Sequence, residues 1–411
     1  MLILVLAIAL TGFFLVSQTT NQELKLALRL ATLLAAAFIS LHLANRFFAR
    51  FADPIMLPLS AFLCSLGLVV IWRLKPNLAI AQLGWILIGT AAALMVLAFI
   101  RRYQDLKNYK YTFAIAGIVL LFAPIFIGVE HGGARLWIDI GPISFQPAEI
   151  AKILFVLFLA AYLEEKHELL SISTKRVYGI WVPEPKYLGP LIIMWLISLM
   201  ILVLERDLGT SLLFFGLFLA MLYIATGRAI YVSLGAFLFA AGATICYFVF
   251  SHVQTRIDIW LDPWIDPSGK GYQIIQSIFA ISSGRLAGTG LGLGHPTLIP
   301  AHQTDFIFSA VAEELGLLGG VAVILSYLLL IMRGLKTALA AKDTFGRLVA
   351  AGLSCAFAIQ SFLILGGTTK LIPLTGVTLP YMSYGGSSIL MNFILLALLL
   401  LISERRGVLS E

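Results

Sequence analysis

The stretch "LGTSLLFFGLFLAMLYIAT", residues 208–226, contains no charged side chain. Its length is close to the ~20 residues that an apolar helix needs to cross the hydrocarbon core of a membrane. Similar runs recur along the whole chain, at residues 1–17, 25–45, 54–73, 80–100, 111–129, 147–163, 187–204, 230–250, 306–332, 346–366 and 385–403. We therefore predict an all-α polytopic membrane protein with about twelve transmembrane helices.

The composition agrees with this prediction. The 411 residues are 60% hydrophobic and only 12% charged, whereas an ordinary soluble domain is ~45–50% apolar and ~25% charged. The first run, at residues 1–17, lacks the positively charged start and the cleavage site of a signal peptide, so we interpret it as a spanning helix. Cys64, Cys246 and Cys355 lie far apart within apolar runs, which indicates core residues and no disulfide or metal pattern.

Lysine and arginine residues indicate the orientation. If the N-terminus is cytoplasmic, most of these residues fall in loops on the cytoplasmic side, as the positive-inside rule expects. This arrangement predicts that both termini are cytoplasmic. The net charge of +7 then faces the anionic inner leaflet, so it implies no nucleic-acid partner.

Residues 251–304 form one connection that is much longer than the others. The loop holds Trp260, Trp264 and the moderately apolar segment 271–282, so it is too rich in aromatic and aliphatic residues to be disordered. Long loops with this composition are usually functional. We predict an ordered extracytoplasmic cap that includes an amphipathic helix.

Ionisable residues inside a membrane span are costly, and each one suggests a functional site. Glu149 and Lys152 are three residues apart, so a helix places them on one face. They either neutralise each other as a helix-holding pair, or Lys152 meets an anion. Arg135 and Gln146 precede them in an outward loop. In "ERDLGTS", residues 205–211, Asp207 either caps the next helix or belongs to the same site.

Three more acids occur within ten residues of "AHQTDFIFSAVAEELGLLGG", residues 301–320. Asp305 falls at the start of a long helix, where the helix dipole favours an acid. Glu313 and Glu314 lie deeper and point in different directions, so at least one of them must be buried with a partner. The proline- and glycine-rich block 371–388 predicts irregular backbone lining a cavity.

Together these features predict an outward-opening cavity with cations, isolated carboxylates and irregular backbone. None of these stretches resembles a nucleotide-binding loop, a zinc motif or a Ser-His-Asp arrangement, which argues against chemistry driven by ATP.

Five blocks of this sequence resemble the SEDS family, which includes RodA, FtsW and SpoVE. The blocks occur in the family's order and lie within residues 54–406: "GARLWIDIGPISFQPAEIAK", "RDLGTS", "WLDPWIDPSGKGYQIIQSIFAISSGRLAGTGLG", "LIPAHQTDFIFSAVAEELG" and "LIPLTGVTLPYMSYGGSS". The resemblance implies a peptidoglycan glycosyltransferase that polymerises lipid II outside the cytoplasmic membrane of a bacterium. It also implies a class B penicillin-binding protein as partner, with other membrane proteins of the elongation or division machinery.

The sequence departs from the family pattern in three places. The family usually has ten spans, so residues 1–48 add two helices to a core at residues 49–411. The family's "QPSE" reads "QPAE" here, and an asparagine that often precedes the proline-rich block is missing. The choice between elongation, division and sporulation stays open.

In the family, the aspartate of "TDFIF" is essential, and it corresponds to Asp305. Joining an α-linked lipid pyrophosphate into a β-1,4 chain inverts the anomeric centre, so one base and positive charge on the leaving pyrophosphate suffice. Asp305 is the expected base; coordination of a divalent cation such as Mg²⁺ by the same carboxylate is the alternative. Glu313 and Glu314 are expected to give structural support. The expected substrate-binding residues are Arg135, Gln146, Glu149, Lys152, Asp207, Arg256, Lys370 and Ser383.

Two other functions fit parts of the pattern. A lipid II flippase or another polyprenyl-lipid transporter would use a similar amphiphilic cavity, but the cytoplasmic loops show no matching polar cluster and no inverted repeat is visible. A scaffold that only recruits division proteins would not need isolated carboxylates at the outer interface.

Overall fold

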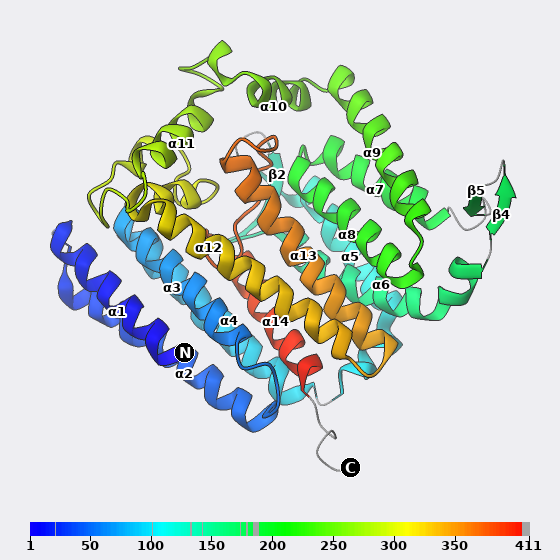
Figure 1. Ribbon diagram of the computed structural model, residues 1–411, viewed down its shortest axis with the longest axis horizontal. Helices are drawn as coiled ribbons and strands as arrows, with labels where there is room; N and C mark the ends of the chain where they lie inside the picture. Colours follow the sequence, from blue (N-terminus) through cyan, green and yellow to red (C-terminus); the bar gives the residue numbers. More distant parts are fainter. Residues whose placement is uncertain are drawn as a thin grey trace. The chain divides into compact units, whose positions relative to one another are not determined.

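The computed structural model describes residues 1–20, 22–100, 102–131, 134–141, 143–172, 174–177, 180–183 and 189–404. Helices dominate the chain (Figure 1). They are α1 (Leu2–Thr19), α2 (Leu24–Phe48), α3 (Met56–Leu74), α4 (Pro76–Phe99), α5 (Lys110–Ile127), α6 (Pro147–Ile172), α7 (Gly189–Leu204), α8 (Leu208–Thr226), α9 (Ala229–Val249), α10 (Ser251–Leu261), α11 (Tyr272–Ser283), α12 (Ile307–Ala340), α13 (Thr344–Thr368) and α14 (Gly386–Ser403).

Each of the twelve predicted apolar runs coincides with one of these helices. Within the described residues, ten helices are long and apolar enough to cross a membrane. The two expected helices outside this set are α6, which carries charged residues near its start and again in "EEKHE", and α7, which has only 16 residues. The chain is therefore an all-α polytopic membrane protein with about ten candidate transmembrane helices.

The chain divides into two compact units. Unit 1 comprises Met1–Arg101, Asp258–Lys336 and Gln360–Glu411, and unit 2 comprises Arg102–Ile257 and Thr337–Ile359. One boundary follows α4, and the other three fall within α10, α12 and α13.

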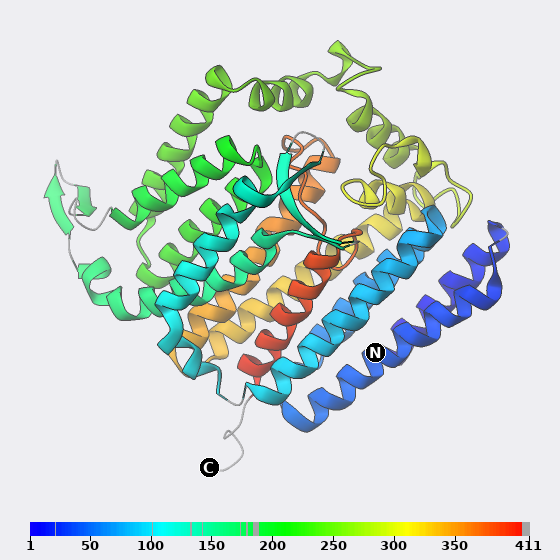
Figure 2. The same cartoon turned by 180° about the vertical axis from the view of Figure 1, so that it is seen from behind.

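In unit 1, α4 packs along α14, α1 packs on α3, and α2 packs on α4. Both ribbon views show α1 and α2 side by side at the edge of this layer (Figures 1 and 2). The buried Phe393 ring of α14 lies 6.0 Å from the Phe38 ring of α2 and 5.9 Å from the Tyr381 ring. Gly89 of α4 allows this close packing, because a Cβ there would come within 2.8 Å of the Phe393 ring.

Helix α11 fills most of the apolar segment that the sequence places in the long loop. Its face with Ile274 and Ile275 is buried against Ile299 and Phe306, just before α12. Polar bonds fix the same face: the Ser277 hydroxyl lies 2.7 Å from the Ser309 hydroxyl of α12 and donates to the Thr368 carbonyl oxygen at the end of α13 (2.8 Å). Helix α11 is thus an amphipathic helix anchored to the start of α12. Short 3-10 turns flank it at Pro263–Ile265 (η3) and Pro296–Leu298 (η4).

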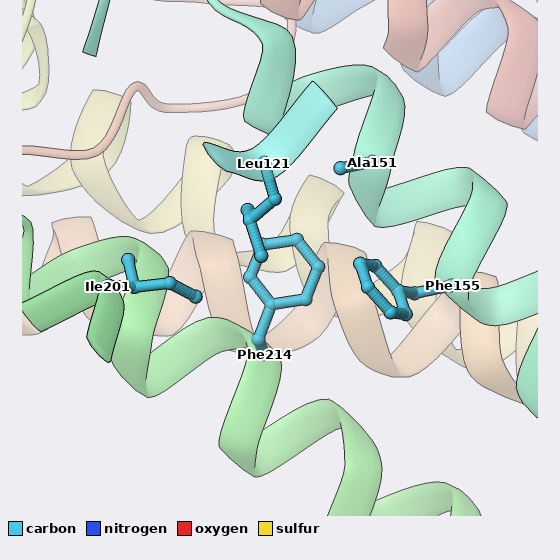
Figure 3. Packing of buried hydrophobic residues seen from close by; sticks show 5 residues of the cluster. All are labelled: Leu121, Ala151, Phe155, Ile201 and Phe214. Carbon is cyan, nitrogen blue, oxygen red and sulfur yellow. The ribbon is translucent and has the colours of Figure 1, made fainter. Parts of the chain in front are cut away.

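The core of unit 2 forms where α5, α6, α7 and α8 meet. Figure 3 shows the side chains of this cluster, which come from all four helices: Leu121, Ala151, Phe155, Ile201 and Phe214. The rings of Phe155 and Phe214 meet edge to face, with centroids 5.3 Å apart. A 3-10 turn, η1 (Tyr103–Tyr109), leads into α5.

Unit 2 also contains strands, which the sequence analysis did not predict. Three antiparallel strands, β1 (Val129–His131), β2 (Ala134–Ile140) and β3 (Ile143–Phe145), form a small sheet in what we expected to be a plain loop before α6. A second hairpin joins β4 (Thr174–Val177) and β5 (Ile180–Pro183). Such short strands give almost no periodic pattern, so hydropathy alone does not reveal them.

Candidate active site

Asp305 lies two residues before Ile307, the first residue of α12. The preceding turn is tight: the amides of Thr304 and Phe306 both donate to the Ala301 carbonyl oxygen, at 3.1 and 3.4 Å. Ala301 itself has a left-handed backbone (φ 56°). Phe306 is fully buried and Asp305 is half-buried. The carboxylate therefore stands at the positive end of the α12 dipole, as the sequence predicts.

His302 lies in the same turn and was missed by the sequence analysis. Its ring is buried, and Nδ1 lies 2.7 Å from the Ile299 carbonyl oxygen. Burial lowers the pKa of His302, and the positive charges of Lys75 and Arg73 lower this pKa further, against the raising effect of the Ile299 bond. The ring is therefore neutral at pH 7, with Nδ1–H donating to Ile299. Its position three residues before Asp305 is the feature of the sequence that could have identified it as a site residue.

Ser383 contacts the Asp305 turn directly. Its hydroxyl donates to the Thr304 carbonyl oxygen (2.5 Å) and accepts from the Leu379 amide (3.0 Å). The next amide, that of Tyr384, donates to the Gln303 carbonyl oxygen (2.9 Å). The proline- and glycine-rich block is thus bonded to both residues that precede Asp305. Ser383 is 2% exposed.

Helix α12 is interrupted at Gly316, whose φ of 67° and ψ of −166° are not helical. The interruption frees carbonyl groups of the preceding turn. Those of Glu313 and Glu314 accept hydrogen bonds from the amides of Thr289 and Gly290, both at 3.0 Å. Amides beyond the break donate back to carbonyl oxygens of the same glycine-rich segment, residues 284–294. This segment of the predicted cap therefore completes the backbone bonding of α12.

The side chains of Glu313 and Glu314 reinforce this junction. The Glu314 carboxylate accepts from Arg73 Nε of α3 (2.9 Å) and from the Gly292 amide (3.0 Å). The Glu313 carboxylate accepts from the His295 amide (2.8 Å). Both acids are buried. The expectation that at least one of them is buried with a partner is confirmed, and the partners belong to the loop and to α3.

Lys370 lies two residues after the end of α13 and has a left-handed backbone (φ 61°). Its carbonyl oxygen accepts from Trp260 Nε1 (3.1 Å), and its ammonium lies 3.5 Å from the Leu261 carbonyl oxygen. The C-terminal end of α10 is therefore attached to the start of the proline- and glycine-rich block.

Glu149 and Lys152 form an ion pair on α6 in unit 2. The Lys152 ammonium lies 2.7 Å from Glu149 Oε2, and both side chains are almost fully buried. The predicted shared face is confirmed. Two charges this deeply buried stabilise the fold only in good geometry, so the pair is weak evidence for a purely structural role.

Asp207 caps α8. Its carboxylate accepts from the Thr210 amide (3.0 Å) and from the Thr210 hydroxyl. Burial raises the pKa of Asp207, while the bonds to Thr210 and the charge of Arg256 lower it. The capping interpretation is confirmed, and Arg256 of α10 acts electrostatically on the same carboxylate.

Glu205 is a buried acid that the sequence analysis quoted but did not consider. It is 1% exposed, and within the described residues its Oε1 has no hydrogen-bond partner. Burial raises the pKa of Glu205 to about 8, with a further contribution from Asp207. Most of this carboxyl is therefore protonated at pH 7.

Arg135 and Gln146 lie near the small sheet. Arg135 of β2 is exposed and pairs with Glu130 of β1 (Nε to Oε2, 3.6 Å). The Gln146 carbonyl oxygen accepts from the Glu149 amide (3.2 Å), at the start of α6. The guanidinium therefore stands outside the core, where an anionic ligand can reach it.

The predicted residues form two sets. Unit 1 contains Asp305 and Ser383, whose side chain is bonded to the turn of Asp305. It also contains Glu313 and Glu314 on the following helix, and Lys370. Unit 2 contains the remainder: Arg135, Gln146, Glu149, Lys152, Asp207 and Arg256. Across the described ranges, no group of three or more His, Cys, Asp or Glu side chains could hold a metal ion.

Comparison with known proteins identifies the family. The model of the FtsW/RodA/SpoVE family of cell cycle proteins matches residues 54–407. The chain belongs to this family. The match includes Asp305, Ser383 and every other candidate residue, whereas α1 and α2 lie outside it.

Relatives within the FtsW/RodA/SpoVE family are similar over most of their length. The chain is 47% identical to the peptidoglycan glycosyltransferase RodA of Mycobacterium tuberculosis, over 89% of this chain and 81% of the relative. It is 34% identical to a probable peptidoglycan glycosyltransferase FtsW of Geobacter metallireducens, over 78% and 83%. A solved structure described as a peptidoglycan synthase complex, reported for its coordination of polymerization and crosslinking, has a similar chain. That chain has a TM-score of 0.70 and 29% identity, with 86% of this chain and 97% of the other covered.

Proposed function

We infer that this chain is a peptidoglycan glycosyltransferase of the RodA/FtsW type. This inference rests on the family match over residues 54–407 and on 47% identity to a RodA across most of both chains. The geometry supports an enzyme, because an acid stands at a helix N-terminus on a turn braced by the proline- and glycine-rich block. A protein that works by recruitment alone would not need this construction.

The substrate that we propose is lipid II, and the reaction is its polymerisation into glycan strands. Asp305 takes the proton of the acceptor hydroxyl as that oxygen attacks the anomeric carbon and the polyprenyl pyrophosphate leaves. Inversion in one displacement requires no covalent intermediate. Cations stabilise the charge on the leaving pyrophosphate. Our candidates for these are Arg135, Lys152, Arg256 and Lys370, with Gln146, Glu149 and Asp207 as further substrate-binding residues.

We also propose the placement in the membrane. Counting α6 and α7 gives twelve spans, made of two additional helices in residues 1–48 and a ten-helix core in residues 49–411. Both termini are then cytoplasmic, and residues 251–304 form a cap on the outer face of the cytoplasmic membrane. The support is the distribution of lysine and arginine, which follows the positive-inside rule for this topology.

The partner that we propose is a class B penicillin-binding protein. A solved chain of similar structure belongs to a peptidoglycan synthase complex that both polymerises and crosslinks, and crosslinking calls for a transpeptidase. Identity to RodA of 47%, against 34% to FtsW, favours a role in elongation over division.

One assay separates polymerisation from lipid transport. Purified protein with its partner transpeptidase receives labelled lipid II in detergent, where no bilayer exists to flip across. We expect glycan strands from the wild type and none from Asp305→Asn, with equal folding of both. Strands made by Asp305→Asn at the wild-type rate would overturn the role of Asp305. A wild type that makes none, but moves lipid II across vesicle bilayers, would favour the transporter.

A further inference from the structure

We propose that Gln82 of α4 is a positioning residue for polymerisation: its amide fixes the turn that places Asp305. This inference rests on the proposed function, because it assumes that Asp305 is the base. Gln82 is remote from Asp305 in the chain and belongs to none of the five motif blocks of the sequence analysis. Its side chain is 1% exposed.

The amide of Gln82 binds the proline- and glycine-rich block in both directions. Nε2 donates to the Ser383 carbonyl oxygen (2.9 Å), and Oε1 accepts from the Gly385 amide (3.2 Å). A primary amide presents a neutral donor and a neutral acceptor on one planar group. The two bonds lie on either side of Tyr384, so they fix the backbone of that residue from both ends.

The same turn carries the bonds to the residues before Asp305. The Tyr384 amide donates to the Gln303 carbonyl oxygen (2.9 Å), and the Ser383 hydroxyl donates to the Thr304 carbonyl oxygen (2.5 Å). A continuous set of hydrogen bonds therefore runs from Gln82 through the turn to the two residues that precede the acid. Each backbone group in this set is held in one orientation by its hydrogen bond.

Loss of the amide has a defined consequence. Ser383 and Gly385 are buried, so their freed carbonyl and amide groups would have to move to find new partners. Motion of the turn carries Gln303 and Thr304 with it. A shift of ~1 Å in a catalytic group can cost ~100-fold in rate. Substrate binding by residues elsewhere is unaffected, so the loss appears in kcat.

The test compares Gln82→Met with the wild type in the lipid II polymerisation assay, as full-length protein with its partner. We expect kcat to fall about 10- to 100-fold with KM changed less than about 2-fold. The matched control is Ser60→Ala on α3, because Ser60 is fully buried and, among the described residues, bonds only within its own helix. The control should keep the wild-type kcat. Wild-type kcat in Gln82→Met, or an increase in KM alone, would overturn the proposal.

Ser383→Ala provides a second variant in case Gln82→Met does not fold. It removes the hydroxyl bonds to Thr304 and Leu379 but keeps the carbonyl group that Gln82 binds. A positioning role lowers kcat, whereas a substrate contact by the Ser383 hydroxyl raises KM, and that second result would count against our inference.

A double variant completes the cycle. If the two residues act through one turn, the combined loss should be close to the larger single loss. Fully multiplicative losses would show that they act independently. Asp305→Asn separates the two proposals: if it polymerises lipid II, the role of Asp305 fails whatever Gln82 does. If it is inactive while Gln82→Met and Ser383→Ala are both normal, only the positioning inference fails.

Discussion

Arg73 of α3 and Glu314 of α12 form an ion pair with Nε and Oε1 2.9 Å apart, although they are 241 residues apart in the chain. The arginine also donates to the Gly294 carbonyl oxygen (2.8 Å), and the glutamate accepts from the Gly292 amide. The pair therefore attaches the glycine-rich segment to two helices at once. It lies beside the break at Gly316, where α12 depends on that segment for its backbone bonds.

Glu314→Leu should destabilise the protein strongly. It leaves the Arg73 guanidinium, which is only 12% exposed, without its carboxylate. Loss of one partner of a buried pair costs about 3–5 kcal/mol. The midpoint of thermal unfolding in detergent measures the effect. Glu130→Ala is the matched control, because the pair of Glu130 with Arg135 is about half exposed and should contribute less than about 1 kcal/mol. Equal small shifts from both variants would contradict the prediction.

A double variant of the Glu149–Lys152 pair tests whether the pair has a structural role or binds substrate. If the pair only holds helices together, replacing both residues by Gln and Met should restore what a single change loses. We expect instead that the double variant folds but stays inactive, because one member binds substrate. Polymerisation of lipid II and the unfolding midpoint are measured on the same preparations. Activity that returns together with folding would make the pair purely structural.

Glu205 should make stability depend on pH. Its pKa is about 8 in the folded protein against 4.5 for the free group, so the folded state binds the proton more tightly. The stability that Glu205 contributes is then fully present below pH 4.5 and is lost as pH rises to about 8. Glu205→Gln removes this titration, so its unfolding midpoint should exceed that of the wild type by more at pH 8 than at pH 5. An equal difference at both values would show that Glu205 does not titrate in this range.

The N-terminal helices should stabilise the core without taking part in chemistry. Helix α1 packs on α3, and a Cβ at Gly292 would lie 2.1 Å from Thr19 Oγ1, so the end of α1 is in close contact with the glycine-rich segment. We expect deletion of residues 1–48 to lower expression and the unfolding midpoint but to leave polymerisation measurable in detergent. A well-folded truncation with no activity would refute this prediction.

The sequence alone determined the fold class, the helices and the family. Hydropathy over ~20 residues is a local property, so each apolar run predicts its helix whatever the rest of the chain does. Capping is equally local, which is why the sequence offered Asp207 as a cap of α8. The position of Asp305 at the start of α12 and the shared face of Glu149 and Lys152 follow from helix geometry for the same reason.

Only the tertiary structure determined which polar groups are partners. Gln82 and Ser383 are 301 residues apart, and no local pattern links them. Burial leaves each buried donor or acceptor dependent on whichever group packing brings near it. The Gly316 break is also decided by tertiary contacts, since its freed carbonyl groups are satisfied by a segment more than twenty residues earlier. The role of Glu205 likewise arises from burial, because the pKa of this carboxyl group rises when the fold removes water from it.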